Sequence, residues 1–325
     1  EMRFHLVIAM LLLQWGMAVA QTVPSPEENI DFITTFGAEI DGTYGDDDGF
    51  QTFFFIVPEN ISSPIYFHLF DPDCGGRHDL AIDGFNTSTA FELYGGYGAY
   101  SDTSAQGFSK PAMVSGNLLY SKVFEAGYGD DRWVKVGPFN PAEGEYIKAL
   151  GGYVFKWIIL GRTGNDGNVY RMRLSLNKQT DSPVPGANAF TFKYTFRLKS
   201  NKGSVAHIHP LIGDNVIALK QHNFDFDNEG KIRLFSVDKN GIMLKRSGEG
   251  NWVDQSIDIS PNENGKSMNI QFLKSGSRIN DMTIFILNQY NKAVPLYAIP
   301  IGGIPRFKPK YEIQKTYQRN KIYMR

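Results

Sequence analysis

The stretch Gln51-Thr52-Phe53-Phe54-Phe55-Ile56-Val57 determines how this chain folds. All of its residues after Gln51 are β-branched or aromatic, and the run stops at Pro58, which is typical of a strand and its end. A second run, Ile65–Phe70, follows after a short polar loop. Two apolar runs joined in this way predict a β-hairpin.

Further runs of the same kind follow along the chain, and clusters of Gly, Asn, Asp and Pro separate them. Beyond the first twenty residues, no stretch keeps the 3.6-residue period of an amphipathic helix. We therefore expect an all-β protein, either a sandwich or a barrel. The runs lie at 153–160, 169–176, 190–198, 216–219, 231–237, 267–273 and 282–287.

Several short landmarks occur twice in the same order, which predicts an internal repeat. We interpret the chain as two tandem, duplicated β-sandwich domains of jelly-roll type, at 30–185 and 186–302, with residues 21–29 as a linker. The first set of landmarks is Trp133-Val134, Pro141-Ala142-Glu143, Asn165-Asp166, Leu176-Asn177 and Pro183, and the second is Trp252-Val253, Pro261-Asn262-Glu263, Asn280-Asp281, Leu287-Asn288 and Pro295.

Upstream of these landmarks, Phe67–Asp73 is matched with Ile232–Asp238. This alignment places Ser236 opposite Asp71, so it predicts that an acidic site at Asp71 belongs to the first copy alone. The first copy is also longer, and most of the extra length falls in an insertion at 75–131. Loops carried by a rigid scaffold commonly hold functional residues.

The insertion contains three tyrosines among glycines, Tyr94, Tyr97 and Tyr100. Flat aromatic rings on a Gly-rich loop form a stacking platform for sugar rings, so these residues are the candidate ligand-binding site. The alternative is that the rings fill the core, as aromatic side chains commonly do.

Four aspartates lie beside the first two strands. Asp46 and Asp48 precede the first strand, and Asp71 and Asp73 follow the second. Oxygen ligands in loops next to strand ends suit Ca²⁺, and only Arg77 is near to neutralise them. The sequence therefore predicts one Ca²⁺ site formed by these residues. A solvated acidic turn is the alternative.

A strand ending in Val57-Pro58, a short loop, and an apolar strand that runs into Asp71-Pro72-Asp73 together form a pattern. This pattern resembles secreted Ca²⁺-binding jelly-roll modules, which include carbohydrate-binding modules and the C-terminal β-domains of bacterial exported proteases. The resemblance implies a module that binds glycans or stabilises a partner domain.

The first twenty residues match a signal peptide, with Arg3, the apolar run Leu6–Leu13 and the cleavage signal Ala18-Val19-Ala20. Cleavage would leave Gln21 first. No later segment is long and apolar enough to cross a membrane. We expect an exported protein, in the extracellular space, on the cell surface or in the periplasm. The single cysteine excludes an intrachain disulfide and favours a bacterial source.

The charges are unevenly distributed. The net charge is -1, so the chain as a whole is not a nucleic-acid binder. The segment 303–325 nevertheless carries most of its charges as Lys and Arg, interleaved with Tyr311, Tyr317 and Tyr323. This basic tail is expected to dock on an anionic surface.

Taken together, these features favour an exported, non-catalytic surface or extracellular binding protein that recognises a glycan or a surface protein through loops of the first copy. One alternative is a glycan-degrading hydrolase or lyase that uses Glu92, Glu143 or Glu145. Another is a subunit of an envelope assembly or scaffold. No common serine-hydrolase, zinc-protease or phosphate-loop motif is present in the sequence.

Overall fold

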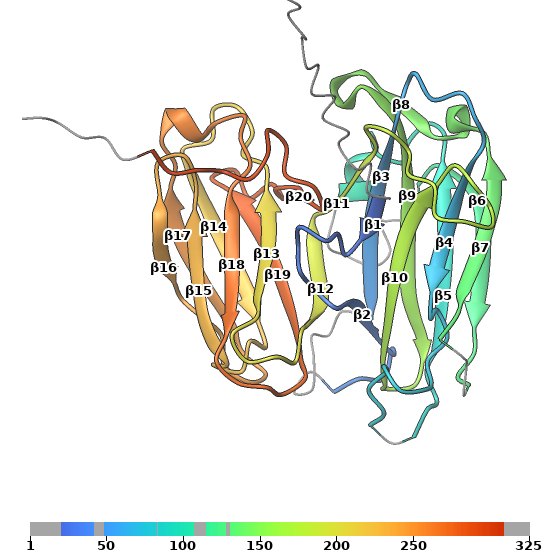
Figure 1. The fold of residues 1–325 in the computed structure, drawn as a ribbon, viewed down its shortest axis with the longest axis horizontal. Coiled ribbons are helices and arrows are strands. Elements are labelled where there is room, and N and C mark those ends of the chain that lie inside the picture. The colour runs from blue at the N-terminus through green and yellow to red at the C-terminus, as the bar shows by residue number, and fades with distance from the viewer. Residues whose placement is uncertain (1–20, 42–48, 83, 107–114, 128–130, 309–325) are drawn as a thin grey trace, which may run out of the picture.

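The computed structural model describes residues 21–41, 49–82, 84–106, 115–127 and 131–308 (Figure 1). In this part of the chain the regular structure consists of strands in two sheets and short 3₁₀ helices. The prediction of an all-β protein is therefore confirmed. The 3₁₀ helices are η1 (Thr103–Gln106), η3 (Pro141–Glu143), η4 (Lys148–Leu150) and η5 (Pro261–Glu263).

The smaller sheet has nine strands and runs through the whole molecule. Eight of them form its path, and β1 (Gln21–Val23) pairs with β10 beside that path. In spatial order the path is β17 (Trp252–Asp258), β14 (Ala218–Phe224), β19 (Asn280–Asn288), β12 (Lys193–Leu198), β2 (Phe32–Phe36), β10 (Gly167–Ser175), β4 (Ile65–Phe70) and β7 (Trp133–Phe139).

The larger sheet has eleven strands, and β8 (Glu145–Ile147) pairs with β9 beside its path. In spatial order the path is β16 (Asn240–Leu244), β15 (Gly230–Phe235), β18 (Asn269–Lys274), β13 (Val205–Pro210), β20 (Leu296–Tyr297), β11 (Asn188–Thr191), β3 (Phe50–Pro58), β9 (Gly152–Thr163), β5 (Ser88–Gly95) and β6 (Asn117–Phe124).

The predicted hairpin between the first two apolar runs is wrong, because β3 and β4 belong to different sheets. Nearly every residue of β3 is buried, on both faces of the strand. Such a strand lies inside a sheet, and β3 pairs with β9 on one edge and β11 on the other. The polar loop at 59–64 therefore crosses from one layer to the other.

The order of strand pairing is the same in the two halves of the molecule. In the first half the sets are β2–β10–β4–β7 and β3–β9–β5–β6, and in the second half they are β12–β19–β14–β17 and β13–β18–β15–β16. Each set of eight strands runs in the same chain order, and eight strands in two sheets is the number found in jelly rolls. Common descent of the halves stays a prediction.

This order corrects the alignment of Phe67–Asp73 with Ile232–Asp238. The counterpart of β4 is β14, because each lies between the equivalents of β10 and β7. Phe70 pairs with Trp133 across β4 and β7, and Phe224 pairs with Trp252 across β14 and β17. The residue that corresponds to Asp71 is therefore Asp225.

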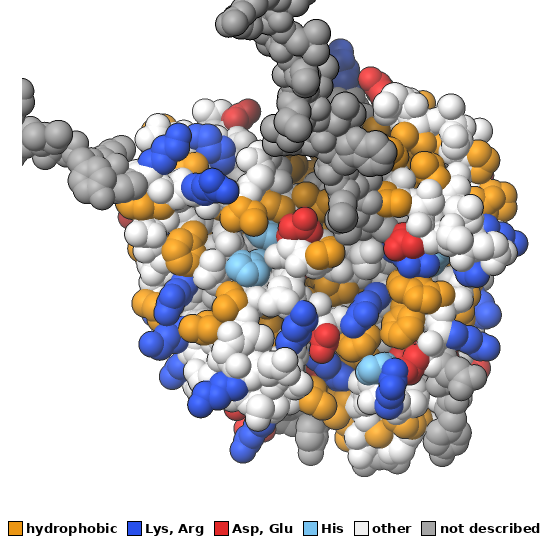
Figure 2. Space-filling model, in the orientation of Figure 1, with side chains coloured by type: hydrophobic (Ala, Val, Ile, Leu, Met, Phe, Trp, Pro, Cys, Tyr) orange, Lys and Arg blue, Asp and Glu red, His pale blue; other side chains and the backbone are white. Residues whose placement is uncertain are grey.

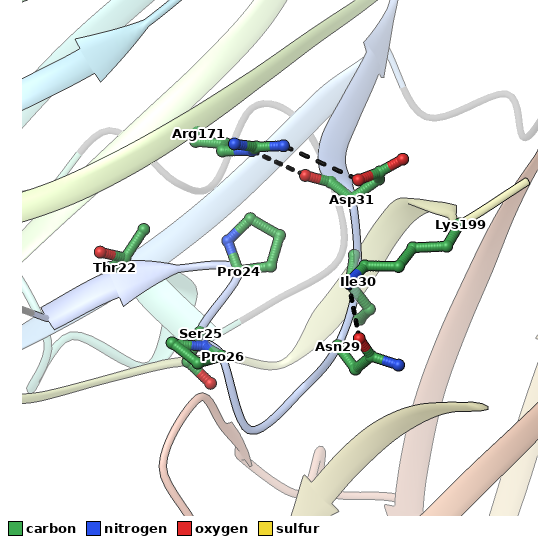
Figure 3. Close-up of a pocket in the computed structure, with 9 residues that line it drawn as sticks. All are labelled: Thr22, Pro24, Ser25, Pro26, Asn29, Ile30, Asp31, Arg171 and Lys199. Carbon is green, nitrogen blue, oxygen red and sulfur yellow. Dashed lines mark hydrogen bonds and ion pairs between the residues drawn. The ribbon is translucent and has the colours of Figure 1, made fainter. Parts of the chain in front are cut away.

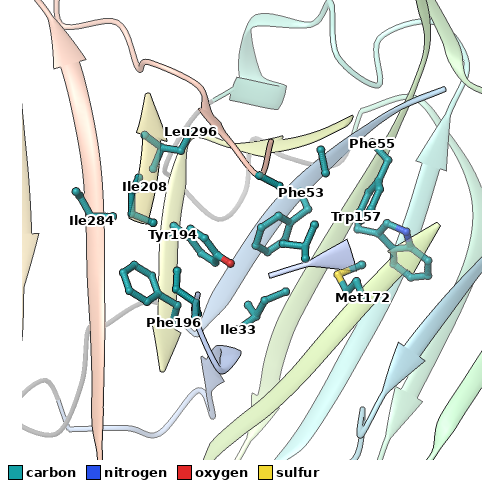
Figure 4. Packing of buried hydrophobic residues seen from close by; sticks show 14 of the residues in the cluster. Ile33, Phe53, Phe55, Trp157, Met172, Tyr194, Phe196, Ile208, Ile284 and Leu296 are labelled. Carbon is teal, nitrogen blue, oxygen red and sulfur yellow. The ribbon is translucent and has the colours of Figure 1, made fainter. Parts of the chain in front are cut away.

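One buried hydrophobic cluster extends through both halves. In Figure 4, Phe53 lies between Tyr194 and Phe196 of the second half and Trp157 and Met172 of the first. The rings of Phe53 and Tyr194 meet edge to face, with centroids 5.5 Å apart. The sandwich is therefore held together by a core that both halves share.

A buried ion pair of the second half lies at the seam and forms hydrogen bonds across it. Arg197 on β12 and Asp281 on β19 form an ion pair at 2.7 Å, and both side chains are 6% exposed. The Asp281 carboxylate also accepts a hydrogen bond from Thr34 Oγ1 on β2, at 2.8 Å. Arg197 donates in addition to the carbonyl of His78, in the loop after β4. These bonds join strands of one half to a strand and a loop of the other.

The segments expected to be an insertion and a linker are part of the fold. Residues 75–131 contain β5 and β6, which have β15 and β16 as their counterparts. Most of the extra length of the first half lies in the connections 71–87 and 96–116, against 225–229 and 236–239 in the second. Residues 21–29 contain β1, which pairs with β10.

Candidate functional site

The loop after β4 contains the first candidate site, and it lies at the lower edge of the molecule in Figure 1. It begins with Asp71, whose φ of 54° is in the left-handed region. The Asp71 N–H donates to the Arg132 carbonyl at 3.0 Å, which ties this loop to the one before β7. The backbone therefore turns inward as soon as the strand ends, and it buries the residues that follow.

Asp71 and Asp73 are both buried, with exposed fractions of 0% and 9%. Both carboxylate oxygens of Asp71 and Oδ1 of Asp73 are buried without a hydrogen-bond partner among the described residues. A buried charge without a partner is costly, so such groups are normally paired, protonated or bound to a metal. Burial, together with Asp131 and Asp73, raises the pKa of Asp71 to about 7.

Asn168 adds an oxygen that the sequence did not point to. Its side chain is fully buried on β10, and its Nδ2 donates to the Pro72 carbonyl at 2.9 Å. The Asn168 Oδ1 atom is buried and has no partner among the described residues. Carboxylates, an amide oxygen and water are the ligands that Ca²⁺ prefers, so Asp71, Asp73 and Asn168 are of the chemical types that suit a calcium site.

Two other acidic residues near this site, Asp79 and Asp131, have partners of their own. Asp79 accepts hydrogen bonds from the N–H groups of Gly75 and Val169, each at 2.7 Å. Asp131 pairs at 2.6 Å with Arg77, the nearby cation noted in the sequence. In the described part of the chain, no three His, Cys, Asp or Glu side chains are grouped to hold a metal. A calcium ion here would need the amide oxygen and water besides Asp71 and Asp73.

Asp46 and Asp48, the remaining predicted ligands, lie outside the described residues. The same holds for the predicted signal peptide and for the tail beyond residue 308. Cys74 follows Asp73 and is buried. Burial, followed by the charges of Asp79 and Asp166, raises the pKa of its thiol well above the ordinary value, which makes it a poor nucleophile.

The three tyrosines of the predicted platform have different surroundings. Tyr94 is 4% exposed, and its hydroxyl donates to Glu92 at 2.7 Å. Tyr100 is half-buried, with its ring edge to face against Phe54. Tyr97 is 91% exposed. Of the three rings, therefore, Tyr97 alone offers a free face to a ligand.

Glu145 fixes the loop that carries Tyr97. Its carboxylate is 6% exposed and accepts hydrogen bonds from the N–H groups of Gly98, Tyr100 and Ser101. Burial alone would raise the pKa of Glu145, but a hydrogen bond from the Ser101 hydroxyl, together with these backbone bonds, outweighs burial and holds that pKa below the ordinary value. The carboxylate is thus a structural anchor.

The other two carboxylates proposed for a hydrolase also have structural partners. Glu143 accepts from the Asn140 N–H in the capping box of η3. Glu92 accepts from Tyr94 and lies 3.7 Å from the guanidinium of Arg162. These contacts favour structural roles for both side chains.

A hollow of about 380 Å³ lies beside the connection from β1 to β2, with Arg171 and Lys199 in its wall (Figure 3). Arg171 donates to the Asp31 carbonyl at 2.8 Å, and Lys199 donates to Asn29 Oδ1 at 2.6 Å. Both cations are thus engaged within the chain. The face in Figure 2 shows Lys and Arg side chains over both halves and no broad acidic patch.

A second hollow, of about 560 Å³, lies where the predicted basic tail begins. Arg306 and Lys308 line it, together with Lys266 from the connection between η5 and β18. The first residues of the tail thus lie against the body of the second half. No helix in the described residues is long and apolar enough to cross a membrane.

No protein family model matches the sequence, and no curated protein matches it. One solved structure with a partial likeness is the crystal structure of the T13 IBDV viral particle, at 10% sequence identity. The match covers 84% of this chain and 74% of that one, with a TM-score of 0.17. A likeness of this degree carries no argument about fold or function.

Proposed function

We propose that this chain is an exported binding protein whose first half is stabilised by a calcium ion held at Asp71 and Asp73. The observation that supports the proposal is the burial of three carboxylate oxygens of these two residues without a hydrogen-bond partner. Export is proposed from the sequence of residues 1–20 alone.

Calcium is the ion that suits the available donors. It accepts carboxylate, amide and water oxygens in flexible geometry, whereas Mg²⁺ demands a nearly ideal octahedron and zinc prefers His and Cys. With Asp71, Asp73 and Asn168 as the protein ligands, the site resembles the weak sites of extracellular modules, for which dissociation constants of roughly 0.1 to 1 mM are typical. Such an affinity suits a compartment rich in calcium.

Thermal unfolding in calcium and in chelator tests this proposal. If calcium binds the folded state alone, it adds about 2.7 kcal/mol to the free energy of unfolding at 100 times its dissociation constant. The double variant Asp71→Asn plus Asp73→Asn should lose the part of the calcium-dependent gain that comes from the ion at these two residues, and it should remain folded in chelator. A matched control is Asp214→Asn plus Asp258→Asn, two exposed residues of the second half, which should respond like the wild type. If the wild type has the same melting temperature in calcium and in chelator, the proposal of a stabilising calcium ion is wrong.

The ligand of this binding protein is proposed to be a glycan or a surface protein that contacts the loop of Tyr97. The 91% exposure of its ring, on a loop that Glu145 holds in place, supports this part of the proposal. Titration calorimetry against a panel of polysaccharides tests it, with Tyr97→Ala as the variant. Tyr290→Ala removes another exposed ring, in the second half, and is the control. Binding that survives Tyr97→Ala would place the ligand elsewhere.

A further inference from the structure

The loop after β14 begins in the same way as the loop after β4. Asp225 corresponds to Asp71, and the left-handed φ angles are 59° and 54°. Both loops open with the sequence Phe-Asp-x-Asp, at residues 70–73 and at residues 224–227. The two halves thus place a pair of aspartates at equivalent strand ends.

An asparagine supports each loop from the start of the neighbouring strand. In the second half Asn280 on β19 donates from Nδ2 to the Asp225 carbonyl at 3.0 Å and to Asp227 Oδ2 at 2.9 Å. Asn168, at the equivalent position on β10, donates to the carbonyl of Pro72, one residue further along its loop. The Asn280 side chain is 2% exposed, and its Oδ1 is buried without a partner among the described residues, as is Oδ1 of Asp227.

These groups surround a hollow of about 160 Å³. Its wall holds Asp225, Asp227, Asn280 and Asp281, with Glu249 and Ile279 on the second half and Leu80 from the loop after β4. We infer that this hollow is a second cation site, in which Asp225, Asp227 and the Asn280 side-chain oxygen bind Ca²⁺. It stands on its own contacts and does not depend on a calcium ion at Asp71.

Asp225 Oδ1 accepts a hydrogen bond from the Gly250 N–H at 2.7 Å, and the cations around the hollow have other partners. Asp281 is already neutralised by Arg197. Lys274 is the other cation close to Asp227, and its Nζ donates to the Arg278 carbonyl. Glu249 is exposed, so its carboxylate is free to approach an ion from the solvent side. Water supplies the remaining ligands, since Ca²⁺ takes six to eight oxygens.

The position of the hollow indicates a structural role for the ion. Leu80 belongs to the first half, and the same loop accepts the hydrogen bond of Arg197 at His78. A cation bound here lies at the seam and neutralises carboxylates beside the ion pair of Arg197 and Asp281. The second site would therefore stabilise the contact between the halves as well as one loop.

Equilibrium dialysis of the full chain against calcium, with the bound metal counted by atomic absorption, tests the inference. The wild type should bind two ions, and Asp225→Asn plus Asp227→Asn should bind one. The double variant Asp71→Asn plus Asp73→Asn should also bind one, and this result belongs to the first proposal alone. If Asp225→Asn plus Asp227→Asn binds as much calcium as the wild type, the second site is refuted, whatever the first pair does.

A single exposed substitution tests the second site without altering buried residues, so a change in binding cannot be explained by misfolding. Glu249→Gln changes only an exposed side chain, so the fold should persist, and calcium affinity at one of the two sites should fall several-fold. Lys231→Gln, an exposed change on β15, should leave both affinities unaltered. An unchanged binding curve for Glu249→Gln would overturn the assignment, even where the Asp225 and Asp227 double variant loses an ion because it misfolds.

Discussion

The loops after β4 and β14 begin alike and then diverge. Both enter a left-handed turn at an aspartate, and both are supported by an asparagine of the neighbouring strand in the sheet. The first continues through residues 71–87 and encloses its carboxylates, whereas the second returns to the sheet after 225–229 and leaves a hollow at the seam. The acidic arrangement therefore depends on the end of the strand and not on the length of the loop.

The largest expected effect comes from separating the two halves. A chain that ends at residue 185 should fail to melt cooperatively, because β2 loses β12, β3 loses β11, and the shared core is exposed to water. Calorimetry of this fragment and of the full chain measures the difference. A fragment with a cooperative transition near that of the full chain would show that the halves are independent domains.

Breaking the ion pair at the seam should have the next largest effect. Asp281→Asn leaves Arg197 buried without its charge partner, which should lower the free energy of unfolding by about 3 to 5 kcal/mol. Asp254→Asn breaks the exposed pair with Lys220 in the same sheet and should cost less than about 1 kcal/mol. Urea unfolding measures both. Equal losses would mean that the seam contributes no more than the surface does.

The loop that carries Tyr97 has no counterpart of similar length in the second half, and Glu145 should account for its order. Glu145→Ala leaves three backbone N–H groups without their acceptor and should lower the free energy of unfolding by about 2 to 3 kcal/mol. Glu143→Gln alters only an exposed cap and should cost less than about 1 kcal/mol. If the two variants unfold alike, Glu145 is not the anchor of the loop.

The sequence pattern was sufficient to predict the all-β fold class, because β-branched and aromatic runs such as Phe53–Val57 almost always form strands. It failed on pairing, because local pattern does not reveal that β3 is buried on both faces and needs two partners. It also aligned Asp71 with Ser236, since an apolar run ending in Phe recurs before both residues. The repeated Phe-Asp-x-Asp was the signal that would have identified Asp225.

Part of each candidate site could be predicted from the sequence. Carboxylates next to strand ends pointed to Asp71 and Asp73 as neighbours, and the structure buries both. The roles of Asn168 and Asn280 depend on strands that are distant in sequence, so spacing alone could not indicate them. The three tyrosines do not form one exposed platform, because Tyr94 lies on β5 and is buried, whereas Tyr97 lies in the loop beyond β5 and is exposed.

The most direct test of the account is a crystal structure from crystals grown in about 10 mM calcium, an excess over the affinity expected of such sites. The anomalous signal of calcium would be measured at long wavelength. The account predicts one peak between Asp71 and Asp73 and another between Asp225 and Asp227, each with oxygen ligands at about 2.3 to 2.6 Å. Well-ordered carboxylates with no peak at either position would contradict it.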